Sequence, residues 1–324
     1  MVQLTCGGRR IALEPEENVL TALERSGIAL PSSCRAGACQ SCLVQVKRGA
    51  ITGPAQVGLK DSLRAQGFVL ACQAIPTEDW EISVEAARGL DLPARIESVE
   101  RLSQDVALVQ LSVEGALSYR AGQYLTLTRE DGLSRSYSIA SRPADGPWLQ
   151  LHVRIYPAGK MSSWLGSDVA QGARVTVRGP AGECFYTEGR AEQPLVLAGV
   201  GTGLAPLWGI LREALAADHR GPIQLWHGAR VPSGLYLQAE LRRLQAEHEH
   251  FCYRPCALEG DASELCVGKL DELLLAQTPS FAEPRFFLCG DAPLVQSLKR
   301  ALFLRGAALK NIYADPFLVA ASPG

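Results

Sequence analysis

Residues 1–88 contain short stretches in which apolar and polar residues alternate, a pattern typical of half-buried β-strands. One helix is expected over Asn18–Ser26, because apolar residues recur there at helical spacing and Gly27 provides a natural stop. Gly89–Pro93 is interpreted as a linker that closes this first domain. The expected strands are Val2–Cys6, Arg10–Leu13, Cys42–Lys47 and Trp80–Glu85.

Residues 94–188 are almost entirely of β character, with one helical stretch near Met161–Val169. Six short strands at this spacing, separated by turn residues, predict a small antiparallel six-stranded β-barrel. The expected strands are Ala94–Val99, Val106–Val113, Tyr124–Thr128, Ser136–Ala140, Leu149–Ile155 and Arg174–Arg178.

Residues 192–324 alternate between short apolar runs and helical segments such as Ala205–Ala217 and Gln238–Glu249. This alternation is typical of a doubly wound parallel α/β sheet. The sequence therefore predicts three domains, over residues 1–88, 94–188 and 192–324. The strands expected in the third domain are Leu195–Ala198, Ile223–His227, Phe251–Arg254 and Arg285–Cys289.

The composition is that of an ordinary globular protein, with 47% apolar and 20% charged residues. Lys and Arg number 32 against 34 Asp and Glu, so the charge gives no reason to expect nucleic acid or an anionic membrane as a partner. The N-terminus lacks an apolar core behind a basic start, and the apolar run Leu195–Leu211 is interrupted by glycine and proline. We therefore expect a monomeric, cytoplasmic protein that does not enter a membrane.

Ten cysteines are the unusual feature of this composition, and four of them form a motif. Cys34, Cys39 and Cys42 stand in the spacing C-x₄-C-x₂-C, and Cys72 follows alone. This is the spacing of a plant-type [2Fe–2S] cluster held by four thiolates. Four cysteines also suit Zn²⁺, but zinc sites usually present two separate C-x₂₋₄-C pairs. Pro31–Cys42 is also similar to the cluster loop of plant-type ferredoxins, which implies a β-grasp fold for the first domain.

The barrel segment Arg135-Ser136-Tyr137-Ser138 resembles the R-x-Y-[ST] motif of the ferredoxin–NAD(P)H reductase family. In this family the arginine binds the FAD pyrophosphate, the tyrosine packs on the isoalloxazine, and the hydroxyl lies near flavin N5. The resemblance implies these roles for Arg135, Tyr137 and Ser138, with Ser136 in the same binding segment and Ser138 as a catalytic residue. From the pattern alone, an alternating tyrosine is more often a core residue.

A second barrel segment, Gly159-Lys160-Met161-Ser162, looks like the family's G-x-x-[ST] element, which begins a short helix whose amides bind phosphate. Gly179–Gly182 matches a third family element at the end of the barrel. Arg154 is a further candidate for the flavin site, although a surface ion pair explains it equally well.

Gly199–Pro206 lies between an apolar strand and a helix, which is the position of a phosphate-binding loop. It matches the family's G-x-G-x-G-x-x-P form, not the G-x-G-x-x-G fingerprint. The candidate nucleotide-binding residues in this loop are Gly201, Thr202, Gly203 and Pro206.

Leu288–Val295 resembles the family's C-G-x-x-x-[ML]-[VI] signature. The resemblance implies that Cys289, a candidate catalytic residue, lies beside the nicotinamide, with Gly290 and Asp291 next to it. A buried strand-end cysteine is the alternative for Cys289. The closing segment Ile312–Phe317 resembles that of the family's oxygenase reductases, where Phe317 either covers the flavin face or packs the terminus.

The choice between NADH and NADPH depends on the residues after the second strand of the third domain. The acidic residue that binds a ribose 2′-hydroxyl is absent, and Arg230 stands there instead. Arginine at this place occurs with both nucleotides in the family, and Val231–Gly234 supplies no second positive charge for a 2′-phosphate. We therefore expect NADH as the donor.

The resemblance covers essentially the whole chain, in the order ferredoxin–FAD–NAD, and is similar to reductase components of bacterial aromatic-ring dioxygenases and multicomponent monooxygenases. It implies electron transfer from NADH through FAD to the [2Fe–2S] cluster and on to a partner oxygenase, since a flavin links two-electron donors to one-electron acceptors. The alternatives are a reductase that feeds a deoxysugar dehydratase, NADPH as the donor, and a non-enzymatic protein with a zinc-stabilised docking module that senses nucleotide.

Overall fold

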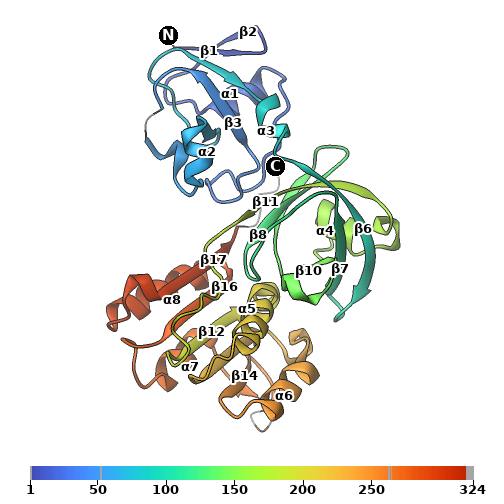
Figure 1. The fold of residues 1–324 in the computed structure, drawn as a ribbon, viewed down its shortest axis with the longest axis vertical. Helices are drawn as coiled ribbons and strands as arrows, with labels where there is room; N and C mark the ends of the chain where they lie inside the picture. Colours follow the sequence, from blue (N-terminus) through green and yellow to red (C-terminus); the bar gives the residue numbers. More distant parts are fainter. Residues whose placement is uncertain (1, 52, 262, 264, 319–324) are drawn as a thin grey trace.

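The computed structural model describes residues 2–51, 53–261, 263 and 265–318, and its strands form three separate sheets. Figure 1 shows three domains in a row along the longest axis, with the barrel between the other two. Hydrogen bonds from the barrel reach both neighbours: Thr126 contacts Cys39 of the first domain, and Ser138 contacts Asp315 of the third. The barrel therefore contacts both of the other domains.

The first domain is a five-stranded mixed sheet in the order β2-β1-β5-β3-β4, in which only β1 and β5 are parallel. Helix α1 packs its apolar side, which includes Leu20 and Leu23, into the same buried core as Leu4 and Leu43. This is the expected β-grasp arrangement. Its elements are β1 (Gln3–Cys6), β2 (Arg9–Ala12), α1 (Val19–Arg25), β3 (Leu43–Arg48), α2 (Asp61–Ala65), β4 (Phe68–Leu70), β5 (Trp80–Ser83) and α3 (Glu85–Arg88).

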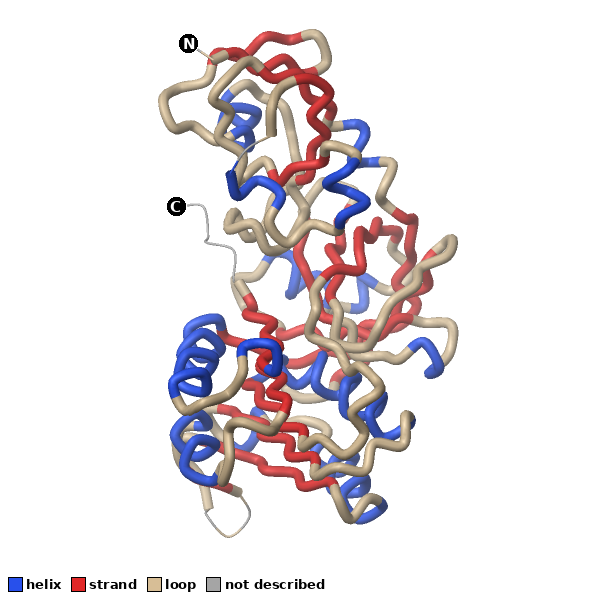
Figure 2. Tube along the Cα trace, turned by 60° about the vertical axis from the view of Figure 1, so that its left-hand side comes forward, coloured by secondary structure: helices blue, strands red, loops and turns tan. Residues whose placement is uncertain are grey.

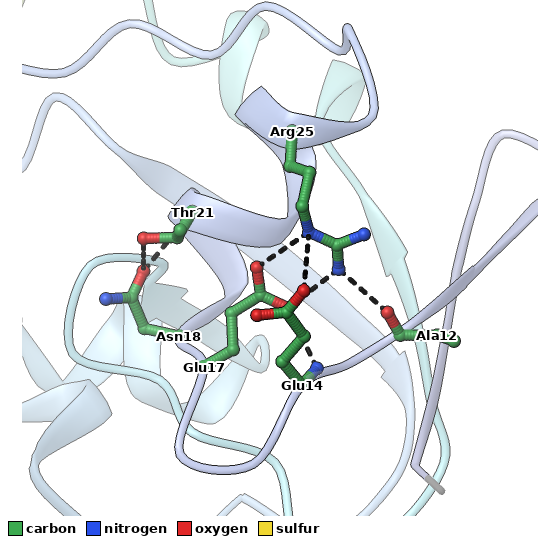
Figure 3. A network of polar contacts seen from close by, with 6 residues as sticks. All are labelled: Ala12, Glu14, Glu17, Asn18, Thr21 and Arg25. Carbon is green, nitrogen blue, oxygen red and sulfur yellow. Dashed lines mark hydrogen bonds and ion pairs between the residues drawn. The ribbon is translucent and has the colours of Figure 1, made fainter.

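Polar contacts fix both ends of α1 (Figure 3). At its start, Asn18 Oδ1 accepts a hydrogen bond from the backbone N–H of Thr21 at 2.9 Å, which satisfies a free helix donor. At its end, Arg25 donates to the carbonyl of Ala12 at 2.9 Å and forms an ion pair with Glu17 at 2.8 Å. The arginine lowers the pKa of the Glu17 carboxyl and ties the helix to the end of β2.

The second domain is a six-stranded antiparallel sheet in the order β10-β7-β6-β11-β8-β9, closed by a bridge between Ile139 and Leu151. This closure forms the predicted barrel around a core that includes Leu111 and Leu127. Met161 of the short helix α4 is buried in the same core. The elements are β6 (Leu92–Arg101), β7 (Val106–Val113), β8 (Tyr124–Arg129), β9 (Ser134–Ser138), β10 (Leu149–Arg154), α4 (Lys160–Leu165) and β11 (Arg174–Ala181).

The third domain is a parallel sheet in the order β15-β14-β13-β12-β16-β17, with helices on both faces (Figure 2). Alternate strand residues face the two helix layers: Leu197 packs with α5 and α6, whereas Ala198 packs with α7 and α8. The predicted doubly wound fold is confirmed. The elements are β12 (Leu195–Val200), α5 (Leu204–Ala216), β13 (Ile223–Ala229), α6 (Gln238–Glu247), β14 (Phe251–Ala257), β15 (Cys266–Val267), α7 (Leu270–Gln277), β16 (Arg285–Asp291), α8 (Ala292–Leu304) and β17 (Ile312–Phe317).

Several predicted boundaries are wrong although the order and type of the main elements are right. The linker Gly89–Pro93 is too long, because β6 begins at Leu92, which pairs with Val177 of the barrel sheet. The strand from Trp80 ends at Ser83, because helix α3 follows directly. The strand expected over Ser136–Ala140 begins two residues earlier, the helical stretch Met161–Val169 ends at Leu165, and α2, β4, β15 and β17 were not predicted.

Helix α5 packs directly against the barrel through a glycine. A Cβ at Gly209 would lie 2.8 Å from Cβ of Ala121 and 2.9 Å from the carbonyl oxygen of Ala140, both in the barrel domain. A side chain at this position therefore has to push the helix away from the barrel.

We expect Gly209→Ala to lower the melting temperature, measured by calorimetry. Alanine favours a helix interior by about 1 kcal/mol over glycine, but overpacking a tight contact costs about 1–3 kcal/mol. Gly89→Ala is the matched control, because a Cβ there would meet only the Ala86 carbonyl oxygen, at 3.6 Å. A Gly209→Ala protein as stable as the control would contradict the expectation that overpacking at this contact outweighs the gain in helix propensity.

Candidate redox site

The four motif cysteines meet in the first domain as two pairs of thiols. Cys34 and Cys39 share one hydrogen bond, and Cys42 and Cys72 share another. In each pair the hydrogen bond from the thiol partner lowers the pKa of one cysteine, Cys39 in the first pair and Cys72 in the second. Among the described residues, no three His, Cys, Asp or Glu side chains converge on a single ion. Two thiol pairs match a cluster in which each of two irons takes two thiolates.

Hydrogen-bond donors surround these sulfurs. The Cys34 sulfur accepts from the backbone N–H of Cys39 at 3.2 Å and from that of Ala36 at 3.4 Å. The Ser41 hydroxyl lies 2.9 Å from the Cys39 sulfur and is buried with it. Donors of this kind favour the thiolate over the thiol and tune the cluster potential. The loop therefore fits a [2Fe–2S] cluster in both donor set and surroundings.

The register between β8 and β9 decides where the Arg135–Ser138 segment points. Tyr137 pairs with Leu125, which lies in the barrel core. Tyr137 accordingly packs against that core, and burial raises the pKa of its hydroxyl. Ser136 and Ser138 alternate with Tyr137 along β9 and therefore project from the opposite face of the sheet.

Arg135 keeps its charge available for an anion. Its guanidinium donates to the carbonyl of the adjacent Ser134 at 2.7 Å, and within the described ranges it makes no ion pair. A guanidinium without a carboxylate partner suits a diphosphate, so the residues present fit the expected flavin nucleotide.

The two predicted catalytic residues meet around a third residue that the sequence analysis did not name, Asp315. The Ser138 hydroxyl donates to Asp315 Oδ2 at 2.8 Å. Asp315 lies on β17 directly beside Cys289 of β16, and the Cys289 sulfur lies 3.6 Å from the sulfur of Cys184. Barrel and third domain thus build one cluster of small polar groups.

Burial controls the charge of this cluster. It raises the pKa of the Asp315 carboxyl to about 6, against the hydrogen bond from Ser138, which lowers it. Burial together with the neighbouring Cys184 thiol raises the pKa of Cys289. The Cys289 thiol therefore stays protonated at neutral pH, and Asp315 is the group that titrates.

Glycines let the loop after β12 lie against the end of β16. A Cβ at Gly203 would overlap the carbonyl oxygen of Cys289, and a Cβ at Gly290 would lie 3.0 Å from the carbonyl oxygen of Val200. Gly290 also has a φ of 116°, which favours glycine. The glycine spacing of the motif is thus explained by contact with the strand that carries Cys289.

A cavity of about 690 Å³ lies between this loop, the carboxyl ends of the third-domain strands and the barrel. Its size and position suit a nucleotide at the edge of a parallel α/β sheet. Gly203 and Pro206 are buried behind the loop. The predicted residues that line the cavity are Arg154, Gly201, Thr202, Arg230, Asp291 and Phe317.

Three predicted residues have structural contacts of their own. Arg154 forms an ion pair with Asp105 at 3.3 Å, the alternative expected for it, while it also lines the cavity. The Ser162 hydroxyl accepts from the backbone N–H of Tyr156 at 3.1 Å and holds the turn before α4. Met161 fills the barrel core, so in this segment the exposed Lys160 and the backbone after Gly159 remain available to a phosphate.

Two further residues of the site had different sequence signals. Asp315 is a carboxylate in the short strand β17, and this isolated charge between apolar residues is its sequence signal. Lys269 lines the cavity from the turn between β15 and α7. Nothing in the sequence around Lys269 points to the nucleotide, because β15 is only two residues long.

Three protein-family profiles match the chain in succession. Residues 4–77 match the 2Fe-2S iron-sulfur cluster binding domain, residues 93–186 the oxidoreductase FAD-binding domain, and residues 197–300 the oxidoreductase NAD-binding domain. Fold and site together define an NAD(P)H-dependent iron–sulfur flavoprotein oxidoreductase.

Full-length relatives share this domain order. The reductase subunit of an aromatic O-demethylase from Amycolatopsis sp. is 33% identical over 97% of this chain and 98% of its own length. The reductase component of a naphthalene 1,2-dioxygenase system from Pseudomonas putida is 29% identical over 95% of this chain and 96% of its own. A crystal structure of an Amycolatopsis cytochrome P450 reductase superposes with a TM-score of 0.69 at 32% identity, covering 98% of this chain and 99% of that one.

The chain belongs to the ferredoxin–NAD(P)H reductase family with a fused plant-type [2Fe–2S] ferredoxin domain, the family of oxygenase reductase components. Its cofactors are the [2Fe–2S] cluster, FAD and NAD(P)H, and it transfers electrons between them. The zinc-stabilised alternative is thereby overturned. No helix in the part of the chain that the structure describes is long and apolar enough to cross a membrane.

We expect Asp315→Asn to change the pH dependence of stability. The native carboxyl has a pKa near 6, against about 3.9 in the unfolded chain. Its stabilising contribution is therefore full below the unfolded pKa and is lost as the pH rises through 6. Asparagine stays neutral. The free energy of unfolding of the variant therefore rises relative to that of the parent as the pH increases from 5 to 8.

Urea unfolding of both proteins at these two pH values measures the difference. A difference that is the same at pH 5 and pH 8 would show that the carboxyl does not titrate in this range.

Proposed function

We propose that this chain transfers electrons from NADH through FAD and its [2Fe–2S] cluster to a terminal oxygenase. The observation that carries the proposal is the barrel's position between the two other redox sites: β8 contacts the cluster loop, and β9 contacts Asp315 beside Cys289. When bound, FAD accepts a hydride and releases electrons singly, which links NADH to a one-electron cluster.

The proposed residue roles follow the contacts of each segment. Cys34, Cys39, Cys42 and Cys72 hold the cluster. Arg135, Lys160 and the backbone around Gly159 bind the flavin diphosphate, and Tyr137 and Ser136 shape the flavin site. Ser138 and Cys289 border the reacting atoms, with Asp315 holding the Ser138 hydroxyl in place. The nucleotide cavity is lined by Gly201, Thr202, Asp291 and Phe317, and Gly290 packs against the loop that forms its wall.

Charge balance in the nucleotide cavity supports NADH over NADPH. The lining cations Arg154, Arg230 and Lys269 are matched by three lining aspartates. Arg154 is already paired with an aspartate at 3.3 Å, and Lys269 with Glu272 at 3.0 Å. This leaves Arg230 as the main counter-charge for a 2′-phosphate. Lys269 is a second positive charge in the cavity lining, but it is already paired with Glu272.

The names of the relatives support an oxygenase as the acceptor. One serves an aromatic O-demethylase and another a naphthalene dioxygenase, so the proposal is a terminal oxygenase and not one oxygenase class. Residues 1–88 carry nine basic and nine acidic side chains, so docking depends on shape more than on charge. Each site is built within one chain, and we propose that the protein acts as a monomer.

Cys39→Ser tests the order of the carriers. We expect NADH to bleach the flavin absorbance at the parent rate, whereas reduction of cytochrome c, a one-electron acceptor protein, is lost because the cluster has lost a ligand. Stopped-flow absorbance and steady-state assays measure the two steps. Cys252→Ser, a partly buried cysteine on β14, is the control and retains both activities. Full cytochrome c reduction by Cys39→Ser would contradict the proposed route.

Glu272→Gln tests the nucleotide preference. Removing the carboxylate releases Lys269 toward the cavity, so kcat/KM for NADPH rises relative to that for NADH. An exposed ion pair is worth about 0.2–1 kcal/mol, which limits the change to about fivefold. Steady-state kinetics with both nucleotides measure the ratio. A parent enzyme that already prefers NADPH would refute the proposed donor, whatever the variant does.

A further inference from the structure

The cluster loop is attached to the barrel through its backbone carbonyls. The carbonyl of Ala38 accepts from the Tyr124 hydroxyl, and that of Ser41 accepts from the Arg178 guanidinium at 3.1 Å. Between them, the carbonyl of Cys39 accepts from the Thr126 hydroxyl at 2.8 Å. Cys39 is one of the cluster-binding cysteines, so this contact reaches the cluster's own ligand.

These donors lie on two neighbouring strands, Tyr124 and Thr126 on β8 and Arg178 on β11. Thr126 of β8 pairs with Arg178 of β11 on one side and with Ser136 of β9 on the other. Tyr124 lies two residues before Thr126 and therefore on the same face of β8. Leu125 and Leu127 point the other way, into the barrel core. The outward face of β8 is thus the surface on which the first domain docks.

The Thr126 hydroxyl joins the cluster loop to the flavin-motif strand. Its oxygen lies 3.2 Å from the Ser136 hydroxyl. A carbonyl can only accept, so the single proton of Thr126 is committed to Cys39, and Ser136 must donate to Thr126. A directed chain therefore runs from Ser136 through Thr126 to the backbone of Cys39. Thr126 is 4% exposed, so water does not readily replace these bonds.

We propose that Thr126 is a positioning residue that holds the cluster loop at a fixed distance from the flavin-motif strand and thereby sets the rate of flavin-to-cluster electron transfer. This inference rests on the electron route proposed above. Each transfer moves one electron from reduced flavin to oxidised cluster, and neither an atom nor a proton passes through the hydroxyl.

A substitution at Thr126 tests the positioning role more directly than a substitution at a neighbouring donor does. Arg178 also forms an ion pair with Asp91 at 2.7 Å, so its substitution leaves a charge in the domain connection without its partner. Thr128 provides a matched control on the same face of β8. It pairs with Ser134 of β9, and its hydroxyl lies 2.8 Å from that of Ser134, but within the described residues this hydroxyl makes no hydrogen bond to the first domain.

The experiment compares Thr126→Val, Thr126→Ser and Thr128→Val as full-length holoproteins. Anaerobic stopped-flow with NADH follows flavin reduction and cluster reduction at separate wavelengths. We expect Thr126→Val to slow cluster reduction severalfold, because the rate of electron transfer falls steeply as the distance between the two carriers grows. Flavin reduction by NADH stays at the parent rate in all three variants. Thr126→Ser and Thr128→Val keep the parent rate of cluster reduction.

Two readouts do not depend on turnover. Hydrogen–deuterium exchange of residues 34–42 should increase in Thr126→Val alone, because the loop loses its central attachment. The EPR spectrum of the dithionite-reduced cluster should be the same in every variant, because no ligand has changed.

Equal cluster-reduction rates in Thr126→Val and Thr128→Val would overturn the inference. An altered EPR spectrum in Thr126→Val would also overturn it, since the effect would then come from the cluster itself. If Thr126→Val does not fold, Thr126→Ser must still match the parent in rate and exchange, and a slow Thr126→Ser overturns the inference. A parent protein whose cluster is not reduced by NADH refutes the proposed function instead.

Discussion

The antiparallel register between β8 and β9 is the constraint on which the other sites depend. It sets Leu125 opposite Tyr137 and Thr126 opposite Ser136, so apolar positions face the barrel core and hydroxyls face outward. A shift by one residue would exchange the two sets and remove both interdomain contacts at once. The buried leucines therefore fix the positions of the outward hydroxyls.

Close approach of backbones sets the remaining distances. Gly209 lets α5 lie on the barrel, and Gly203 lets the nucleotide loop lie on the end of β16. At these points the absence of a side chain permits a close contact between elements, whereas at the cluster loop a hydroxyl bridges the two domains by a hydrogen bond. Backbone packing and hydrogen bonds between domains thus both contribute to the relative placement of the three sites.

The sequence reveals the fold well, because each domain has its own period of apolar residues. Motif spacing also predicts Cys34, Cys39, Cys42 and Cys72 as cluster ligands, since three of them lie within one loop. Contacts between domains are different in kind. Asp315 meets Ser138 across a long stretch of sequence, and Thr126 meets Cys39 across another. Thr126 occupies an ordinary outward strand position, so no local pattern separates it from Thr128.

The nucleotide cavity is lined by charged side chains, whereas the Ser138–Asp315–Cys289 cluster is buried. The cavity carries three cations and three aspartates along its lining, which suits phosphates and ribose hydroxyls. At the cluster, burial holds Cys289 as a neutral thiol and raises the pKa of Asp315 to about 6. A phosphate placed among these poorly hydrated groups would carry a large desolvation cost, whereas an uncharged ring would not. The burial that shifts these two pKa values therefore suits a neutral ring at the barrel end of the site and phosphates in the polar cavity.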